Sequence, residues 1–151
     1  MDEEEKRELL QRIMDNLPVI PYNQLLGLEP GCFDLEQGCI RFDMRPEYVG
    51  NVDYGILHGG LIASLFDIEG GFLLVREGVW HSRKNPAGSP PKVKGGTIDL
   101  HVDYLRPGEG KQFVVTGKIL RRGNKVAVIS CELRNEKDDL LAVATGTYLI
   151  G

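Results

Sequence analysis

The sequence contains few cysteines, and their arrangement argues against two classes of small domain. Its three cysteines, Cys32, Cys39 and Cys131, are odd in number and irregularly spaced. They provide neither a disulfide framework nor the paired spacing that is typical of a zinc site. We therefore expect them to be small apolar side chains in or beside strands.

A long apolar run and an excess of basic residues are also missing. No segment approaches the roughly 20 apolar residues that a membrane-spanning helix needs, and no basic segment followed by an apolar run marks a signal peptide. The 18 basic and 22 acidic residues give a net charge of −4. Nucleic-acid binding needs a basic stripe, so this class of partner is disfavoured. We expect a cytoplasmic protein that associates with neither membrane nor nucleic acid.

The 151 residues are the length of one domain, and they begin with a helical pattern. Residues 3–15 carry apolar side chains on one side and charges on the other, and Pro18 and Pro21 end the pattern. Residues 1–20 are therefore predicted to be an N-terminal helix and linker. Residues 25–35 are predicted to be an irregular first strand, and residues 39–44 a regular one.

The middle of the chain predicts a buried helix. After a loop at residues 45–57, residues 58–75 are apolar on nearly every side of a helical projection. Residues 77–96 are rich in glycine, proline and lysine and predict an exposed loop. Four strand patterns then follow, at residues 97–105, 112–120, 125–133 and 140–150. Short turns between successive strands indicate an antiparallel sheet, so the predicted class is α+β with the sheet wrapped around one helix.

Asp67 is the most informative residue, because it lies inside the predicted helix where nothing else from 59 to 68 is charged. A buried carboxylate is expensive unless it is paired, protonated or used in chemistry. We expect Asp67 to be buried and to act as a general base or nucleophile. Pairing with a loop arginine, or simply a position that faces solvent, is the alternative explanation. Glu69, two residues on, projects to another side of the helix and is expected to be structural or peripheral.

The second candidate feature is the run His58, Gly59 and Gly60 at the start of the helix. Backbone N–H groups in a first helical turn have no partner within the helix, and the helix dipole adds positive potential there. This arrangement can stabilise an oxyanion. Gly59 and Asp67 are eight residues apart (67 − 59 = 8), which is about 12 Å along a helix. One chain cannot easily place both on one carbonyl, so the pattern predicts a homodimer with antiparallel helices.

These residues resemble a known family. The run from Gly55 through His58-Gly59-Gly60 to Asp67, and the later run from Gly95 to Pro107, are similar to the PaaI-like acyl-CoA thioesterases of the hot-dog superfamily. The resemblance covers residues 22–150. It implies an antiparallel sheet around one long helix, a dimer that often pairs into a tetramer, and hydrolysis of acyl-CoA without a metal or cofactor.

The resemblance also implies roles for individual residues. Asp67 would be the nucleophile or general base, and Gly59 of the other subunit the oxyanion donor, with His58 beside it. Asn51 is similar to a loop asparagine that orients water or the thioester, although it stands seven residues before His58 rather than six. Thr97 lies near a position where some relatives place a hydroxyl that assists the carboxylate.

The substrate would be an acyl-CoA whose two ends meet different parts of the chain. Gly60 and Leu61, at the helix start, are candidates for the acyl site. Arg121, Arg122 and Gly123 form a hairpin whose arginines suit the coenzyme phosphates. The loop at residues 76–95 adds four further basic residues and is predicted to be a lid or an interface; these are Arg83, Lys84, Lys92 and Lys94.

Three other interpretations stay open. Asp99, His101 and Asp103 share one face of a predicted strand, but a solvated face explains them better than a metal does. A hot-dog dehydratase or hydratase that acts on acyl carriers is one alternative enzyme. An acyl-CoA-binding protein without catalysis is the other alternative.

Overall fold

The computed structural model describes residues 2–80 and 95–150. Its helical elements are α1 (Glu3–Asn16), η1 (Leu17–Val19), α2 (Pro21–Leu25), η2 (Pro30–Cys32), η3 (Pro46–Tyr48) and α3 (Gly59–Trp80). Its strands are β1 (Phe33–Asp34), β2 (Cys39–Asp43), β3 (Val49–Asn51), β4 (Ile56–Leu57), β5 (Gly96–Tyr104), β6 (Gln112–Arg122), β7 (Val126–Asn135) and β8 (Leu140–Leu149). None of the helices in these ranges is long and apolar enough to cross a membrane.

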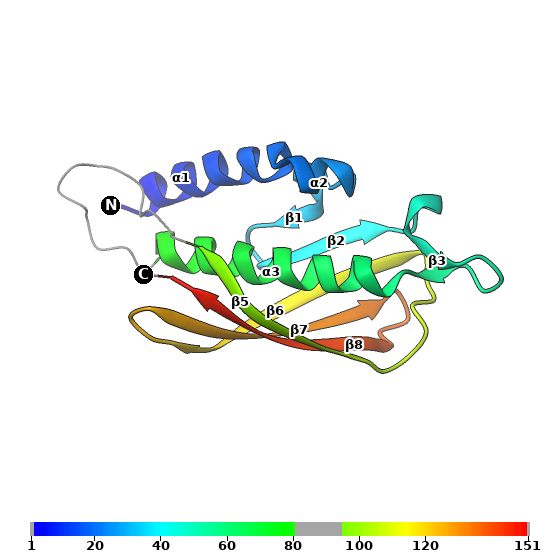
Figure 1. Cartoon of the computed structure of the whole chain (residues 1–151). Coiled ribbons are helices and arrows are strands. Elements are labelled where there is room, and N and C mark those ends of the chain that lie inside the picture. Colours follow the sequence, from blue (N-terminus) through cyan, green and yellow to red (C-terminus); the bar gives the residue numbers. More distant parts are fainter. Residues whose placement is uncertain (1, 81–94, 151) are drawn as a thin grey trace.

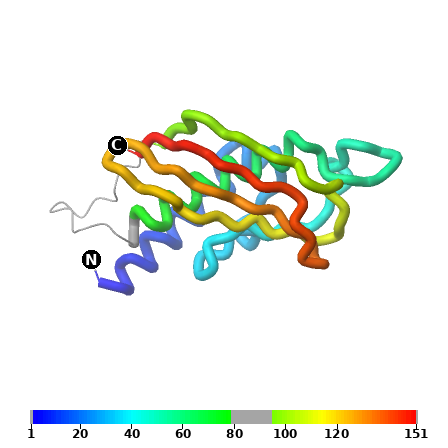
Figure 2. The backbone as a smooth tube through the Cα atoms, turned by 90° about the horizontal axis from the view of Figure 1, so that it is seen from below, coloured from blue at the N-terminus to red at the C-terminus, as the bar shows by residue number. Residues whose placement is uncertain are grey.

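Six of the strands form one antiparallel sheet in the order β1-β2-β6-β7-β8-β5. The sheet curves around α3, and α1 lies on the other side of α3 (Figure 1). Figure 2 shows β6, β7, β8 and β5 side by side, with the β3–β4 hairpin extending beyond one end of the sheet. The predicted α+β class, with a sheet around a central helix and an extra N-terminal helix, is confirmed.

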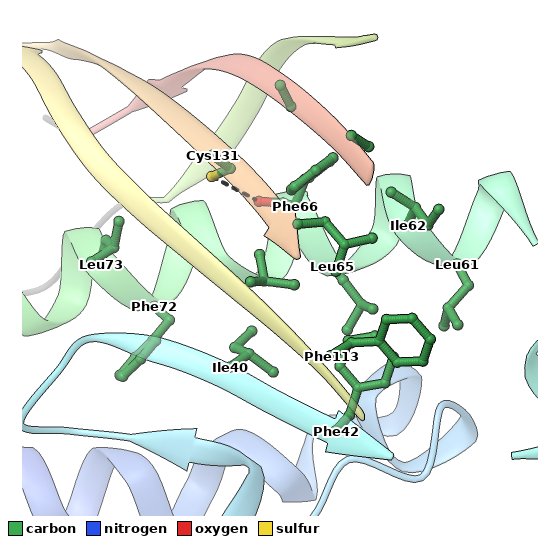
Figure 3. Packing of buried hydrophobic residues seen from close by; sticks show 14 of the residues in the cluster. Ile40, Phe42, Leu61, Ile62, Leu65, Phe66, Phe72, Leu73, Phe113 and Cys131 are labelled. Atoms are coloured by element: carbon green, nitrogen blue, oxygen red, sulfur yellow. Dashed lines mark hydrogen bonds between the residues drawn. The ribbon is translucent and has the colours of Figure 1, made fainter. Parts of the chain in front are cut away.

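The core lies between α3 and the concave face of the sheet. Leu61, Ile62, Leu65 and Phe66 of α3 point toward the strands (Figure 3), and all four are buried. Phe42 of β2 stacks on Phe113 of β6 with ring centroids 5.1 Å apart. A helix that is apolar on nearly every side is stable only when most of its surface is covered, and the sheet supplies that cover.

Four sequence-based boundaries need correction. Residues 25–35 are not a strand: α2 ends at Leu25, η2 covers Pro30–Cys32, and only Phe33–Asp34 pair with β2. The predicted loop at residues 45–57 contains η3 and the β3–β4 hairpin. The predicted linker contains η1, which begins directly after α1. The central helix continues past Val75 to Trp80, so the exposed loop begins later than expected.

The N-terminal helix begins with a capping box. The side chain of Asp2 accepts from Glu5 N–H, and the Glu5 side chain accepts from Asp2 N–H, both at 2.8 Å. These bonds satisfy two donors that the first helical turn leaves without partners. Leu10 and Met14 are buried, and Met14 belongs to the main core. The helix is therefore part of the same packed unit as the sheet.

Candidate active site

Asp67 lies near the middle of α3, on the side of the helix that faces the edge strand β5. The residue is half-buried, between the buried position and the solvent-facing position that the sequence left open. Its Oδ1 accepts a hydrogen bond of 2.6 Å from the hydroxyl of Thr97 on β5. A short bond from a fixed donor orients the carboxylate and leaves its second oxygen available to a ligand.

A β-bulge explains how Thr97 reaches Asp67. Thr97 pairs with Tyr148 and Asp99 with Thr147, so the strand holds one extra residue, Ile98, between them. Simple alternation would place Thr97 on the same face as Asp99. The bulge turns Thr97 to the helix-facing side of the sheet, where its partner Tyr148 is also buried.

At the start of α3, His58 acts as the cap. Its Nδ1 accepts a 2.8 Å hydrogen bond from Gly60 N–H, and its backbone oxygen accepts from Leu61 and Ile62. Gly59 N–H has no hydrogen-bond partner in the part of the chain that the structure describes. The neighbouring donors are thus satisfied, and one N–H at the positive end of the helix is left for a ligand.

Tyr104 fixes the position of Gly59. The hydroxyl of Tyr104, at the end of β5, donates to the backbone oxygen of Gly59 at 2.7 Å. A Cβ at residue 59 would lie 3.3 Å from the Tyr104 ring, so glycine permits this close approach. No role for Tyr104 follows from the sequence pattern, because only the sheet brings this residue beside the helix start.

Asn51 lies close to His58 through the β3–β4 hairpin. It pairs with Ile56, and its side-chain oxygen accepts from Asp53 N–H at 3.1 Å. The backbone of Gly50 packs directly on His58, since a Cβ at residue 50 would lie 2.5 Å from His58 Cα. Asn51, His58 and Gly59 therefore form one group of candidate residues at the start of α3.

The hairpin Arg121-Arg122-Gly123 lies at the opposite end of the molecule from this group (Figures 1 and 2). A second bulge separates Ile119 from Arg121, after which Arg121 pairs with Val128 and Arg122 with the buried Ala127. Arg122 therefore shares the helix-facing side of the sheet with Thr97 and Tyr148, whereas Arg121 is on the outer side. Arg83, Lys84, Lys92 and Lys94 lie outside the described residues.

The fully buried carboxylate of α3 is Glu69, which the sequence analysis expected to be structural or peripheral. Its side chain is 0 % exposed, and neither oxygen has a hydrogen-bond partner among the described residues. Burial raises the pKa of Glu69 to about 9, while the positive charge of Arg76 opposes the rise. The carboxyl group is therefore neutral at pH 7 and is placed in the core, away from Asp67.

Tyr148 is a second residue that packs near Asp67 and whose position could not be predicted from the sequence. Its ring fills the space left by two glycines: a Cβ at Gly70 would lie 2.2 Å from its oxygen, and a Cβ at Gly146 2.7 Å from its ring. Its hydroxyl lies 3.5 Å from the backbone oxygen of Phe66. Burial raises the pKa of Tyr148, and the charge of Asp67 adds to the rise. The phenol therefore stays neutral and packs against the turn of α3 that carries Asp67.

Leu61, a candidate for the acyl site, is 7 % exposed and belongs to the core. Gly60, in contrast, is exposed at the helix start. The structure therefore places the candidate residues in three groups: Asp67 with Thr97, the helix start with Asn51, and the arginine hairpin. The first two groups meet the same helix at positions eight residues apart (67 − 59 = 8).

Comparison with known proteins identifies the family. Residues 54–142 match the model of the thioesterase superfamily. The chain is 41 % identical over 137 residues to the medium/long-chain acyl-CoA thioesterase YigI of Escherichia coli (strain K12), covering 87 % of this chain and 86 % of that protein.

Solved structures agree with this assignment. A crystal structure from Shewanella oneidensis related to the thioesterase superfamily has a TM-score of 0.84 and 36 % identity, with 97 % of each chain covered. The BH2602 protein from Bacillus halodurans, solved with CoA, shares the fold at a TM-score of 0.65 and 20 % identity, covering 100 % of this chain and 93 % of that one. The match over more than half of the chain and the close relative together show that this protein belongs to the hot-dog thioesterase superfamily.

Proposed function

We propose that the protein hydrolyses acyl-CoA thioesters to a free acid and CoA. The observation that carries the proposal is Asp67: a half-buried carboxylate of α3 beside the edge strand β5, oriented by Thr97 at 2.6 Å. The relative from Escherichia coli, whose name specifies medium- and long-chain acyl-CoA, supports this substrate class. No metal and no cofactor other than the coenzyme A of the substrate takes part.

Asp67 acts on the thioester carbonyl by one of two routes. As a nucleophile it attacks the carbonyl carbon, the C–S bond breaks, and water then hydrolyses the acyl-aspartate anhydride. As a general base it takes a proton from water, and the resulting hydroxide attacks the same carbon. In both routes the CoA sulfur leaves with the bonding electron pair and gains a proton.

The N–H of Gly59 stabilises the oxyanion that forms on the carbonyl. It is suited to this role because His58 already occupies Gly60 N–H, at 2.8 Å, and because the start of a 22-residue helix carries positive potential. Asn51, next to His58 through the hairpin, orients the water or the thioester. A carbonyl polarised in this way is more electrophilic toward Asp67 or its water.

The complete site needs two chains. Gly59 and Asp67 are eight residues apart in one straight helix (67 − 59 = 8), and that distance of about 12 Å is too long for both to contact one carbonyl group. In a homodimer with antiparallel helices, Gly59 of one subunit faces Asp67 of the other. The outer strand β5 is the natural contact, because it is an edge of the sheet and exposes Ile98 and Tyr104, with the exposed Leu105 directly after it. Such dimers pair further into a homotetramer.

The coenzyme phosphates bind at the hairpin Arg121-Arg122-Gly123. The two arginines end β6, Gly123 N–H donates to Val126 O at 2.8 Å in the turn that follows, and both arginine side chains are exposed. Arg122 is the better candidate of the two, since the second bulge turns it to the same side of the sheet as Thr97.

The protein acts in the cytoplasm, where acyl-CoA is formed and used.

Thiol release from a panel of acyl-CoA substrates tests the proposal. The panel runs from short to long aliphatic chains and includes phenylacetyl-CoA and hydroxybenzoyl-CoA, with the natural protein and Asp67→Asn measured side by side. We expect the substitution to lower kcat by at least about 100-fold, because the amide cannot serve as base or nucleophile. Binding of acyl-CoA without hydrolysis by either protein would favour a binding protein. Hydration of an enoyl thioester without thiol release would favour the dehydratase or hydratase class.

A further inference from the structure

Four apolar side chains lie exposed within seven residues of η1 and α2, and we call them the α2 patch. Their exposed fractions are 59 % for Val19, 45 % for Ile20, 50 % for Tyr22 and 78 % for Leu25. Single exposed apolar residues are common, but several together on one short segment indicate a surface that another molecule covers.

The segment that carries the α2 patch is firmly held. The buried side chain of Asn23 donates to the backbone oxygen of Leu17 at 2.8 Å, which links α2 to η1. The hydroxyl of Tyr48 donates to the backbone oxygen of Leu26 just after α2. Polar contacts therefore fix the backbone, and the apolar side chains remain exposed on a rigid support.

The α2 patch is attached to α3 next to Asp67. The hydroxyls of Tyr22 and Ser64 are 2.6 Å apart, and Ser64 also donates to the backbone oxygen of Gly60 at 2.8 Å. Ser64 precedes Asp67 by three residues (67 − 64 = 3). Residues with this spacing are neighbours on a helix surface. Tyr22, one member of the patch, therefore contacts α3 one helical turn from the residue that carries the carboxylate.

The two sides of Asp67 differ in chemistry. At about 100° per residue, Ser64 lies about 60° to one side of Asp67 and Gly70 about 60° to the other. The Gly70 side packs against Tyr148, whose strand partner Thr97 binds Asp67. The Ser64 side meets Tyr22 and the α2 patch. An acyl chain that leaves the carbonyl at Asp67 thus finds apolar surface on the Ser64 side.

We propose that the α2 patch binds the distal methylene groups of a medium- or long-chain acyl substrate and so sets the chain-length preference. This proposal rests on the proposed thioesterase function. A linear alkyl chain is chemically matched to this group of apolar side chains, which Tyr22 connects to α3 one turn from Asp67. A second copy of the protein is the other molecule able to cover the surface. The size of the assembly, measured with the variant described below, distinguishes these two occupants.

The test is the chain-length profile of the double variant Val19→Thr/Leu25→Gln. Both substitutions keep side-chain size and remove apolar character. We measure kcat/KM for acyl-CoA substrates of four to sixteen carbons, with Leu120→Gln as the matched control because Leu120 is 55 % exposed on β6, far from α2. We expect kcat/KM to fall about tenfold for the longest chains and to stay unchanged for the shortest, since each buried methylene contributes up to about fourfold.

Three outcomes would overturn this inference. An unchanged profile in an active double variant would show that the acyl chain lies elsewhere. An equal loss for all chain lengths, together with a smaller assembly in analytical ultracentrifugation, would show that the patch joins two copies of the chain. If the natural protein hydrolyses no acyl-CoA at all, the proposed function fails first, and the inference fails with it.

Discussion

Thr97 Oγ1 lies 2.6 Å from Asp67 Oδ1, and this contact joins the edge strand β5 to the middle of α3. The two residues are far apart in sequence, and the bulge at Ile98 turns the threonine toward the helix. The contact defines the orientation of the carboxylate, so it leads to the first two predictions.

Thr97→Val is expected to lower kcat by about 10- to 100-fold with little change in KM, because a hydrogen bond to a charged group contributes roughly 1.5–3 kcal/mol. Valine has the shape of threonine without the donor. Thr97→Ser, which keeps the hydroxyl, is the control and should retain most of the activity. Steady-state thiol release measures both variants. Equal activity of Thr97→Val and the natural protein would mean that this hydroxyl does not assist Asp67.

The bulge at Ile98 predicts that the position of the hydroxyl along β5 matters, and not only its presence. Exchanging the two residues, Thr97→Ile with Ile98→Thr, should reduce kcat as strongly as Thr97→Val, because the hydroxyl then lies on the bulged, exposed residue. Deleting Ile98 should preserve activity, since Thr97 still pairs with Tyr148 and Asp99 with Thr147 in an unbroken ladder. A deletion variant that folds but has lost activity would contradict this account of the bulge.

Mixing experiments test whether the site is shared between subunits. Asp67→Asn and the double variant Asn51→Ala/His58→Ala should each be nearly inactive alone. After unfolding and refolding together in equal amounts, about a quarter of the natural number of sites should be restored, because half of the dimers are mixed and each holds one intact site. Thiol release by the mixture measures the recovery. No recovery, despite mixed dimers detected by mass spectrometry, would place the whole site within one chain.

Glu69 should make the stability depend on pH. Burial raises its pKa from an ordinary 4.5 to about 9, so between these values the folded protein holds a proton that the unfolded chain has released. This contribution to stability is complete below pH 4.5 and is lost as the pH rises toward 9. The slope is about 1.4 kcal/mol per pH unit. Urea unfolding of Glu69→Gln between pH 5 and 8 should show a shallower decrease than the natural protein. Parallel curves would show that Glu69 is ionised in the fold.

Local periodicity was sufficient to predict much of the architecture. The all-round apolar pattern of residues 58–75 marked the central helix, and alternation marked the four strands after residue 96, because side-chain periods of 3.6 and 2 are properties of the local backbone. Asp67 was identifiable as the only charge in its stretch of helix. The short elements between residues 17 and 57 were predicted less well, since tertiary contacts such as Tyr48 to Leu26 hold them.

The sequence by itself therefore determined the class of fold, the candidate carboxylate and the glycine-rich helix start. Only the tertiary structure decided three features. The bulge turned Thr97 toward Asp67, and the ring of His58 took Gly60 N–H and left Gly59 N–H without a partner among the described residues. Packing buried Glu69 completely but Asp67 only in part. Each depends on strand register or on packing between residues distant in the chain. A periodic pattern contains no information about the strand or helix on which it will pack.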